Sequence, residues 1–156
     1  MVEKILFVCT GNTCRSAMAA YLAADLAQKK YPQVKLLFDS AGLMAADNIP
    51  ATVEAQDVLA QRGIDMSHHR SKLFKAPMVE KADVIIVMTS AHKKALLYNF
   101  PQGAGKTFTL GELSGSGEDV HDPYCGSHEI YEETAAGLAR EIAVVLDKIV
   151  KQELKM

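Results

Sequence analysis

A cysteine and an arginine lie six positions apart near the start of the chain, in the segment Cys9-Thr10-Gly11-Asn12-Thr13-Cys14-Arg15-Ser16. A cysteine thiolate is a strong nucleophile, and the planar guanidinium of an arginine can hold two oxygens of a phosphoryl group. Ser16 adds a hydroxyl that can lie beside the sulfur and stabilise it as a leaving group. These residue types at this spacing indicate nucleophilic attack by Cys9 on a phosphoryl group bound by Arg15.

The flanking residues predict the elements that this chemistry requires. The apolar run 5–8 is typical of a buried strand, and the alanine-rich stretch 16–31 favours a helix that ends before Pro32. In a strand–loop–helix turn, backbone N–H groups and the positive end of the helix dipole point into one small bowl, which suits a phosphate or a thiolate. Gly11 and Asn12 tolerate the positive φ angles of a curled loop. Residues 10–16 are therefore expected to bind phosphate.

The rest of the chain alternates predicted strands and helices. Strands are expected over 34–41, 82–88 and 107–110, helices over 51–62, 77–81, 90–100 and 130–152, and a loop over 112–129. Residues 82–88 are apolar on both faces, which indicates a central parallel strand, and Ser90 is the expected N-cap of the helix that follows. This order predicts an α/β fold with helices on both faces of a parallel sheet. Cys9 lies at the carboxyl end of a strand, where such sheets bind ligands.

The overall composition excludes several classes of protein. The chain has 156 residues and a formal net charge of −2, so we expect a single domain over 1–156 and no nucleic acid or membrane partner. No apolar run approaches the ~18 residues of a membrane span, and residues 2–4 lead directly into a strand without the pattern of a signal peptide. Three cysteines argue against a disulfide framework. We therefore expect a cytoplasmic monomer.

The long loop carries a second candidate group in Asp122-Pro123-Tyr124. A carboxyl group can protonate a leaving group and then activate water, and a following proline restricts where the Asp122 side chain points. Tyr124 is a candidate wall of the substrate cleft. The same residues are also an ordinary turn signal. A metal site is a further alternative, built from His121, Asp122, Cys125 and His128, but zinc sites usually show cleaner paired spacings, so no metal is expected.

Four motifs together resemble the low-molecular-weight protein tyrosine phosphatase family, in the family's order and over nearly the full length: residues 9–16, Ser40-Ala41-Gly42, Ser67-His68 and Asp122-Pro123-Tyr124. The resemblance implies a flavodoxin-like three-layer sandwich with a four-stranded parallel sheet and helices on both faces. It also implies a phosphorylated protein as substrate, a phosphate or another oxyanion in the active site, and no metal or other cofactor.

The resemblance also implies roles for individual residues. Cys9 would be the nucleophile that forms a cysteinyl-phosphate, Arg15 the ligand of the phosphate, and Asp122 the general acid and base. A polar network that holds the loop in shape would include Asn12, Ser16, Ser40 and His68.

Thr13 departs from the pattern of the family, most members of which carry a branched aliphatic residue there. In this it resembles the bacterial protein-arginine phosphatase branch, where the hydroxyl orients a phosphoarginine. A hydroxyl can hydrogen-bond a guanidinium or an attacking water, and a methyl group cannot. A neutral substitution of similar shape is the alternative, and Tyr124 could stack on a phenyl ring or on a guanidinium. The choice between phosphoarginine and phosphotyrosine stays open at this point.

Two other functions use a cysteine in related ways. An arsenate reductase on the same fold needs further redox cysteines, typically near residues 82–89, and this chain has none there. A phospho-carrier domain accepts a phosphoryl group on cysteine, but it has no use for a general acid such as Asp122. A phosphatase therefore fits the residues better than either alternative.

Cys14 lies five residues after Cys9 in the same loop. One hypothesis is a reversible Cys9–Cys14 disulfide that protects the nucleophile from irreversible oxidation. The alternative is a small side chain that fills space under the loop.

Overall fold

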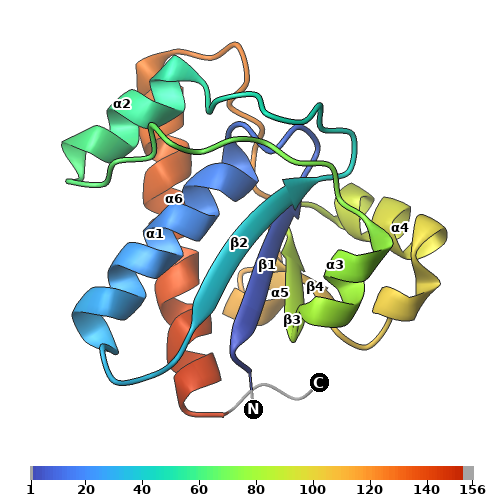
Figure 1. Cartoon of the computed structure of the whole chain (residues 1–156). Coiled ribbons are helices and arrows are strands. Elements are labelled where there is room, and N and C mark those ends of the chain that lie inside the picture. The colour runs from blue at the N-terminus through green and yellow to red at the C-terminus, as the bar shows by residue number, and fades with distance from the viewer. Residues whose placement is uncertain (1, 153–156) are drawn as a thin grey trace.

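The structure is a computed structural model, and it describes residues 2–152 (Figure 1). Four parallel strands form one sheet in the order β2-β1-β3-β4 within the described residues: β1 (Lys4–Cys9), β2 (Leu37–Gly42), β3 (Val84–Val87) and β4 (Thr107–Thr109). The helical elements are α1 (Arg15–Lys30), α2 (Val53–Gln61), α3 (Ala76–Lys81), α4 (Ser90–Asn99), the short 3₁₀ helix η1 (Pro101–Gly103), α5 (Leu110–Ser114) and α6 (His128–Val150). The predicted α/β fold is confirmed.

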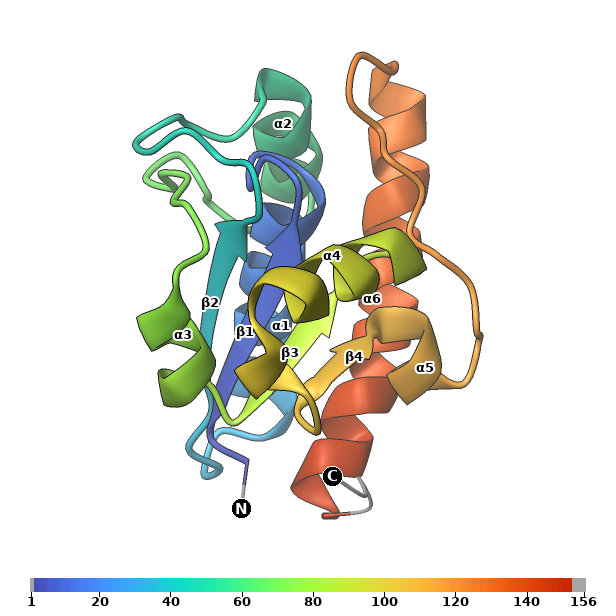
Figure 2. The same cartoon turned by 90° about the vertical axis from the view of Figure 1, so that its right-hand side faces the viewer.

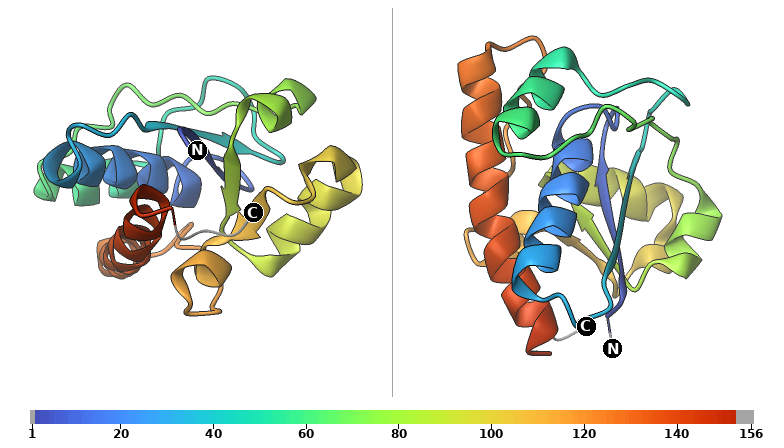
Figure 3. Two further views of the ribbon diagram at one scale, coloured as in Figure 1. Left: turned by 90° about the horizontal axis from the view of Figure 1, so that it is seen from below. Right: turned by 60° about the vertical axis from the view of Figure 1, so that its left-hand side comes forward.

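Helices cover both faces of the sheet, as predicted. Seen from below, α1 and α6 lie on one side, and α3 and α4 lie on the other (Figure 3). Ile5 and Phe7 of β1 pack into the core on the α1 and α6 side, whereas Leu6 and Val8 belong to the smaller core on the opposite side. Because successive side chains of a strand point to opposite faces, β1 is buried on both sides and holds its last residue, Cys9, firmly in place.

The central position predicted for the strand in 82–88 is confirmed. Every residue of β3 is buried, and β3 pairs with β1 on one side and with β4 on the other. The strand predicted over 34–41 begins only at Leu37, and Val34 before it is exposed.

Two local predictions were wrong. The N-cap of α4 is Thr89, whose Oγ1 accepts the N–H of His92, and Ser90 is already the first helical residue. The predicted loop 112–129 contains the end of α5, a helix that begins at Leu110. A capping box between Thr109 and Glu112 explains this helix, and the Thr-x-x-Glu spacing was visible in the sequence.

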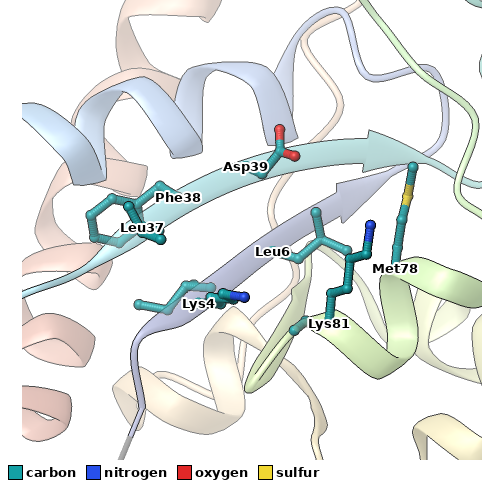
Figure 4. Close-up of a pocket in the computed structure, with 9 residues that line it drawn as sticks. Lys4, Leu6, Leu37, Phe38, Asp39, Met78 and Lys81 are labelled. Atoms are coloured by element: carbon teal, nitrogen blue, oxygen red, sulfur yellow. The ribbon is translucent and has the colours of Figure 1, made fainter.

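The elements that carry the candidate residues meet at one end of the sheet. The carboxyl end of β1, the start of α1 and the segment that climbs from α5 to α6 all reach this end (Figures 1 and 2). An apolar groove lies away from it, between the first halves of β1 and β2 and the helix α3 (Figure 4). None of the predicted site residues lines this groove.

None of the helices in the described part of the chain is long and apolar enough to cross a membrane. The prediction of one domain over 1–156 includes Met1 and residues 153–156, which lie outside the described residues, and it stays a prediction.

Candidate active site

The loop between β1 and α1 curls as expected, but through one residue only. Asn12 has a φ of 59°, in the left-handed region that asparagine tolerates. Gly11 does not have a positive φ, which corrects the expectation that both residues would use this freedom. A Cβ on Gly11 would meet only Thr13 Oγ1, at 3.7 Å, so Gly11 is not required by close packing either.

Two hydrogen-bonding groups contact the sulfur of Cys9, which is buried at the end of β1. Ser16 Oγ lies 2.9 Å from Sγ, and the backbone N–H of Asn12 points to Sγ at 3.4 Å. The start of α1 adds the positive end of a helix dipole. Cys9 Sγ thus lies before the start of a helix with two hydrogen-bonding groups beside it, which is the placement that the predicted nucleophile requires.

Asn12 is the centre of the network that shapes the loop, and its side chain is fully buried. Its Nδ2 donates to Ser16 Oγ at 2.9 Å and to Ser40 Oγ at 2.8 Å, and its Oδ1 accepts the N–H of Lys72 at 3.1 Å. The structure thus places Ser16 and Ser40 in the predicted network. Gly42 lets the loop lie close to β2, because a Cβ at this position would lie only 2.5 Å from the carbonyl oxygen of Thr10.

The histidine that contacts the loop is His69, not His68. His69 is 7% exposed, and its Nε2 lies 2.7 Å from the carbonyl oxygen of Asn12, whereas His68 is exposed. Burial lowers the pKa of His69. The prediction of His68 was wrong because the direction of each side chain in the irregular segment 64–71 depends on how the segment folds back over the loop, which the sequence pattern does not fix.

Arg15 joins the loop between β1 and α1, called the nucleophile loop after the predicted role of Cys9, to the loop that carries Asp122. The guanidinium is buried, its Nη1 donates to the carbonyl oxygen of Val120 at 3.2 Å, and its Nη2 lies 3.6 Å from Asp122 Oδ2. The carboxyl of Asp122 is 55% exposed, and its Oδ1 accepts the N–H of Tyr124 at 3.1 Å. The structure therefore brings Arg15 and Asp122 together, and Arg15 lies at the end of the loop that begins at Cys9.

The loop over residues 115–127 carries Asp122 and is called the acid loop after the predicted role of that residue. It is also anchored next to β3 and to α4. The N–H of Val120 donates to the carbonyl oxygen of Met88 at 2.9 Å. Asp119 Oδ1 accepts the backbone N–H of Ser90 at 2.9 Å and its hydroxyl at 3.2 Å. Sequence reasoning missed Asp119, since nothing in its own neighbourhood distinguishes it from the other polar residues of a loop.

The chain is similar to known proteins. Residues 4–155 match the family described as low molecular weight phosphotyrosine protein phosphatase. The chain belongs to this family. It is 44% identical over 132 residues to a protein-arginine-phosphatase of Geobacillus stearothermophilus, covering 84% of this chain and 85% of that relative. It is 36% identical over 149 residues to a probable low molecular weight protein-tyrosine-phosphatase, EpsP, of Ralstonia solanacearum, covering 96% and 97%.

Solved structures agree with the fold. The YwlE arginine phosphatase from Geobacillus stearothermophilus has a TM-score of 0.89 at 38% identity, covering 97% of this chain and 95% of its own. A YwlE cysteine-to-serine mutant with a phosphorylated active-site serine has a TM-score of 0.91 at 35% identity, covering 96% and 97%. The tyrosine phosphatase Wzb from Escherichia coli K30 with sulphate has a TM-score of 0.85 at 27% identity, covering 96% and 99%. The protein is thus a low molecular weight protein phosphatase, of the phosphoric monoester hydrolase class.

Three residues of the two loops are at least partly open to solvent. Thr13 is half-buried, and its carbonyl oxygen accepts the N–H of Thr52 at 3.1 Å. Tyr124 is 62% exposed. Cys125 has a φ of 64°, a left-handed conformation that favours glycine or asparagine.

The alternative metal site does not form. Among the described residues, no three His, Cys, Asp or Glu side chains gather where they could hold a metal ion. His128 instead pairs with Asp57 of α2 at 3.0 Å, and Asp122 faces Arg15.

Cys14 is buried, and its sulfur contacts a residue of α6. All three cysteines are free thiols, and Cys14 Sγ lies 3.4 Å from Tyr131 Oη, while Cys9 Sγ contacts Ser16. Burial raises the pKa of Tyr131, which keeps its hydroxyl protonated beside Cys14. A Cys9–Cys14 disulfide would require Cys14 to leave this contact.

Mild peroxide should nevertheless produce the Cys9–Cys14 disulfide, because the two thiols share one short loop. Mass spectrometry of peptides after treatment should find this disulfide in the wild type. In Cys14→Ala, we expect sulfinic acid on Cys9 instead, whereas Cys125→Ser should behave like the wild type. Sulfinic acid on Cys9 of the wild type, with no internal disulfide, would rule out protection.

The stability of the phosphatase should fall in acid because of His92. Burial, and then the Arg15 charge, lower the pKa of His92 from 6.5 to about 4. In the unfolded chain His92 has its ordinary pKa, so as the pH falls the unfolded chain binds a proton at His92 before the folded protein does. The free energy of unfolding should decrease by roughly 2–3 kcal/mol between about pH 6.5 and pH 4. Urea unfolding across this range should show a smaller decrease for His92→Gln, and an equal decrease in both proteins would contradict the assignment.

Proposed function

We propose that the protein removes phosphoryl groups from arginine side chains of proteins through a cysteinyl-phosphate on Cys9. The observation that supports this proposal most directly is the junction of Arg15 with both loops. One buried guanidinium follows the nucleophile loop, bonds the carbonyl oxygen of Val120 and lies 3.6 Å from the Asp122 carboxylate. The guanidinium proposed to bind phosphate thus connects the loop that begins at Cys9 with the loop that carries the proposed acid, Asp122.

In the first step the Cys9 thiolate attacks phosphorus, and the bond from phosphorus to the leaving group breaks. Asp122, protonated, gives its proton to the leaving nitrogen, or to the phenolic oxygen of a phosphotyrosine. Arg15 and the backbone N–H groups of residues 10–16 balance the charge on the phosphoryl oxygens. Ser16, at 2.9 Å from the sulfur, and the N–H of Asn12 stabilise Sγ when it leaves in the second step.

In the second step Asp122, now a carboxylate, takes a proton from water while the water oxygen attacks phosphorus. The S–P bond breaks, inorganic phosphate leaves, and Cys9 returns to the thiolate. Two relatives support this scheme: in a YwlE mutant a serine that replaces a cysteine carries the phosphoryl group, and Wzb binds sulphate, an analogue of phosphate. A phosphorylated protein as substrate and an oxyanion in the bowl follow from it.

Thr13 favours phosphoarginine over phosphotyrosine. Its half-buried side chain lies in the nucleophile loop, and its hydroxyl can accept a hydrogen bond from a guanidinium N–H. A relative 44% identical to the chain is named a protein-arginine-phosphatase, which supports this choice. We also infer that the enzyme acts as a monomer in the cytoplasm, where free thiols persist.

The preference can be tested with matched peptides that carry phosphoarginine or phosphotyrosine. We expect the wild type to have the higher kcat/KM for phosphoarginine. Thr13→Ile should shift the ratio of the two values toward phosphotyrosine by at least about tenfold, since a hydrogen bond to a charged group contributes about 1.5–3 kcal/mol. Thr13→Ser keeps the hydroxyl and should keep most of the ratio. A ratio that Thr13→Ile leaves unchanged would show that Thr13 does not select the substrate.

A further inference from the structure

His92 is a buried histidine to which the mechanism above gives no role. It lies in the first turn of α4 and is only 8% exposed. Its Nε2 lies 2.8 Å from Thr10 Oγ1, across 82 positions of sequence. Because Thr10 directly follows Cys9, this contact ties α4 to the nucleophile loop one residue from the sulfur.

The second ring nitrogen indicates which way this hydrogen bond runs. His92 Nδ1 is buried and has no hydrogen-bond partner within residues 2–152. A buried N–H without a partner is rarer than a buried acceptor without one, which favours the ring form with its proton on Nε2. The ring then donates to Thr10 Oγ1, and the Thr10 hydroxyl hydrogen remains free for another acceptor. Burial and the nearby Arg15 charge keep the pKa of His92 low, so the ring is neutral at pH 7.

Thr10 is held from two sides. Its carbonyl oxygen accepts the N–H of Met44 at 3.0 Å, and a Cβ on Gly42 would collide with that oxygen. His92 provides the contact on the side-chain end. Thr10 is an exposed residue, and its side chain is held by the contact to His92.

The same turn of α4 also holds the acid loop. Ser90, two residues before His92, donates its N–H and its hydroxyl to Asp119. The cap of the helix fixes His92 as well, because its own N–H donates to Thr89 Oγ1 at 3.0 Å. One rigid turn therefore contacts the loop of the nucleophile and the loop of the acid.

We propose that His92 is a positioning residue for phosphate binding, which acts through Thr10 to hold the first residues of the bowl in their binding shape. The inference rests on the proposed function of residues 10–16 as the phosphate site. A preformed bowl presents its N–H groups to the phosphoryl oxygens without first having to be ordered. His92 itself touches no reacting atom.

The test is a double-mutant cycle with inorganic phosphate as the probe. His92→Leu and Thr10→Val each remove the hydrogen bond, and the inhibition constant of phosphate against p-nitrophenyl phosphate hydrolysis measures the bowl directly. We expect each single variant to raise this constant by about 3–15-fold. The inhibition constant of the double variant should not exceed the larger of the two single-variant constants, because both changes remove the same contact. His92→Gln, whose side-chain amide can reach the place of Nε2, should restore at least half of the lost binding free energy.

The outcomes separate this inference from the proposed function. If phosphate does not inhibit the wild type, the bowl is not a phosphate site and the proposed function fails. If phosphate inhibits the wild type but the effects of the two variants multiply, or the constant is unchanged while the melting temperature falls, His92 has only a structural role. Circular dichroism of each variant confirms that it is folded, and Thr10→Val still tests the contact if His92→Leu does not fold.

Discussion

Replacing Cys9 by serine should abolish turnover of p-nitrophenyl phosphate while leaving the phosphate site intact. A serine hydroxyl is not ionised in the place where the thiolate acts, and the site offers no base next to it: the neighbours of Sγ are Ser16 Oγ and the N–H of Asn12, both donors to a thiolate. We expect kcat to fall by about 10⁵-fold or more, as for other removed nucleophiles. Steady-state assays at high enzyme concentration measure this loss.

The affinity of Cys9→Ser for phosphate should not fall with its activity. Serine has nearly the size of cysteine, so the Asn12 network and the position of Arg15 should persist. Removal of a negative charge from beside the oxyanion should keep or improve the affinity for phosphate, which isothermal titration can measure. Cys125→Ser, which changes an exposed thiol instead, should retain activity within about twofold. Substantial turnover by Cys9→Ser would remove the covalent step from the mechanism.

Replacing Asp122 by asparagine should give the second largest loss, about 10²–10⁴-fold in kcat. Asparagine is close in size and can still accept the N–H of Tyr124, but it can neither give nor take a proton. The loss should be greatest for phosphoarginine and phenyl phosphate, whose leaving groups need the proton. It should be smallest for p-nitrophenyl phosphate, because nitrophenolate leaves readily without one.

This dependence on the leaving group distinguishes acid catalysis from a structural effect. Asp122→Asn also removes the charge that faces Arg15 at 3.6 Å, and a loss from that cause alone would be equal for all substrates. Glu118→Gln is the matched control, since it neutralises an exposed carboxylate of the same loop and should stay within about twofold. Equal losses for all three substrates would remove the role of general acid from Asp122.

The loop that follows Cys9 could be singled out from the sequence because the residues of its motif are neighbours in the chain. Cys9, Asn12, Arg15 and Ser16 lie within eight consecutive residues, and a strand before and a helix after them restrict the loop to few shapes. The burial of both faces of β3 followed in the same way from an unbroken apolar run. In each case the residues that decide the structure are neighbours in the chain.

The residues that support and complete the site were decided by the tertiary structure. His68 and His69 are adjacent in sequence, and only the fold of segment 64–71 over the loop determines that His69 meets Asn12. Likewise, Arg15 meets Asp122 across 107 positions, Asp119 meets Ser90 across 29, and His92 meets Thr10 across 82. The sequence by itself determined which residues are proposed to react, because that choice depends on residue type and on short spacing. Only the packing of α4 and the acid loop against β1 and β3 determined which side chains hold them, because those contacts depend on how distant segments are brought together.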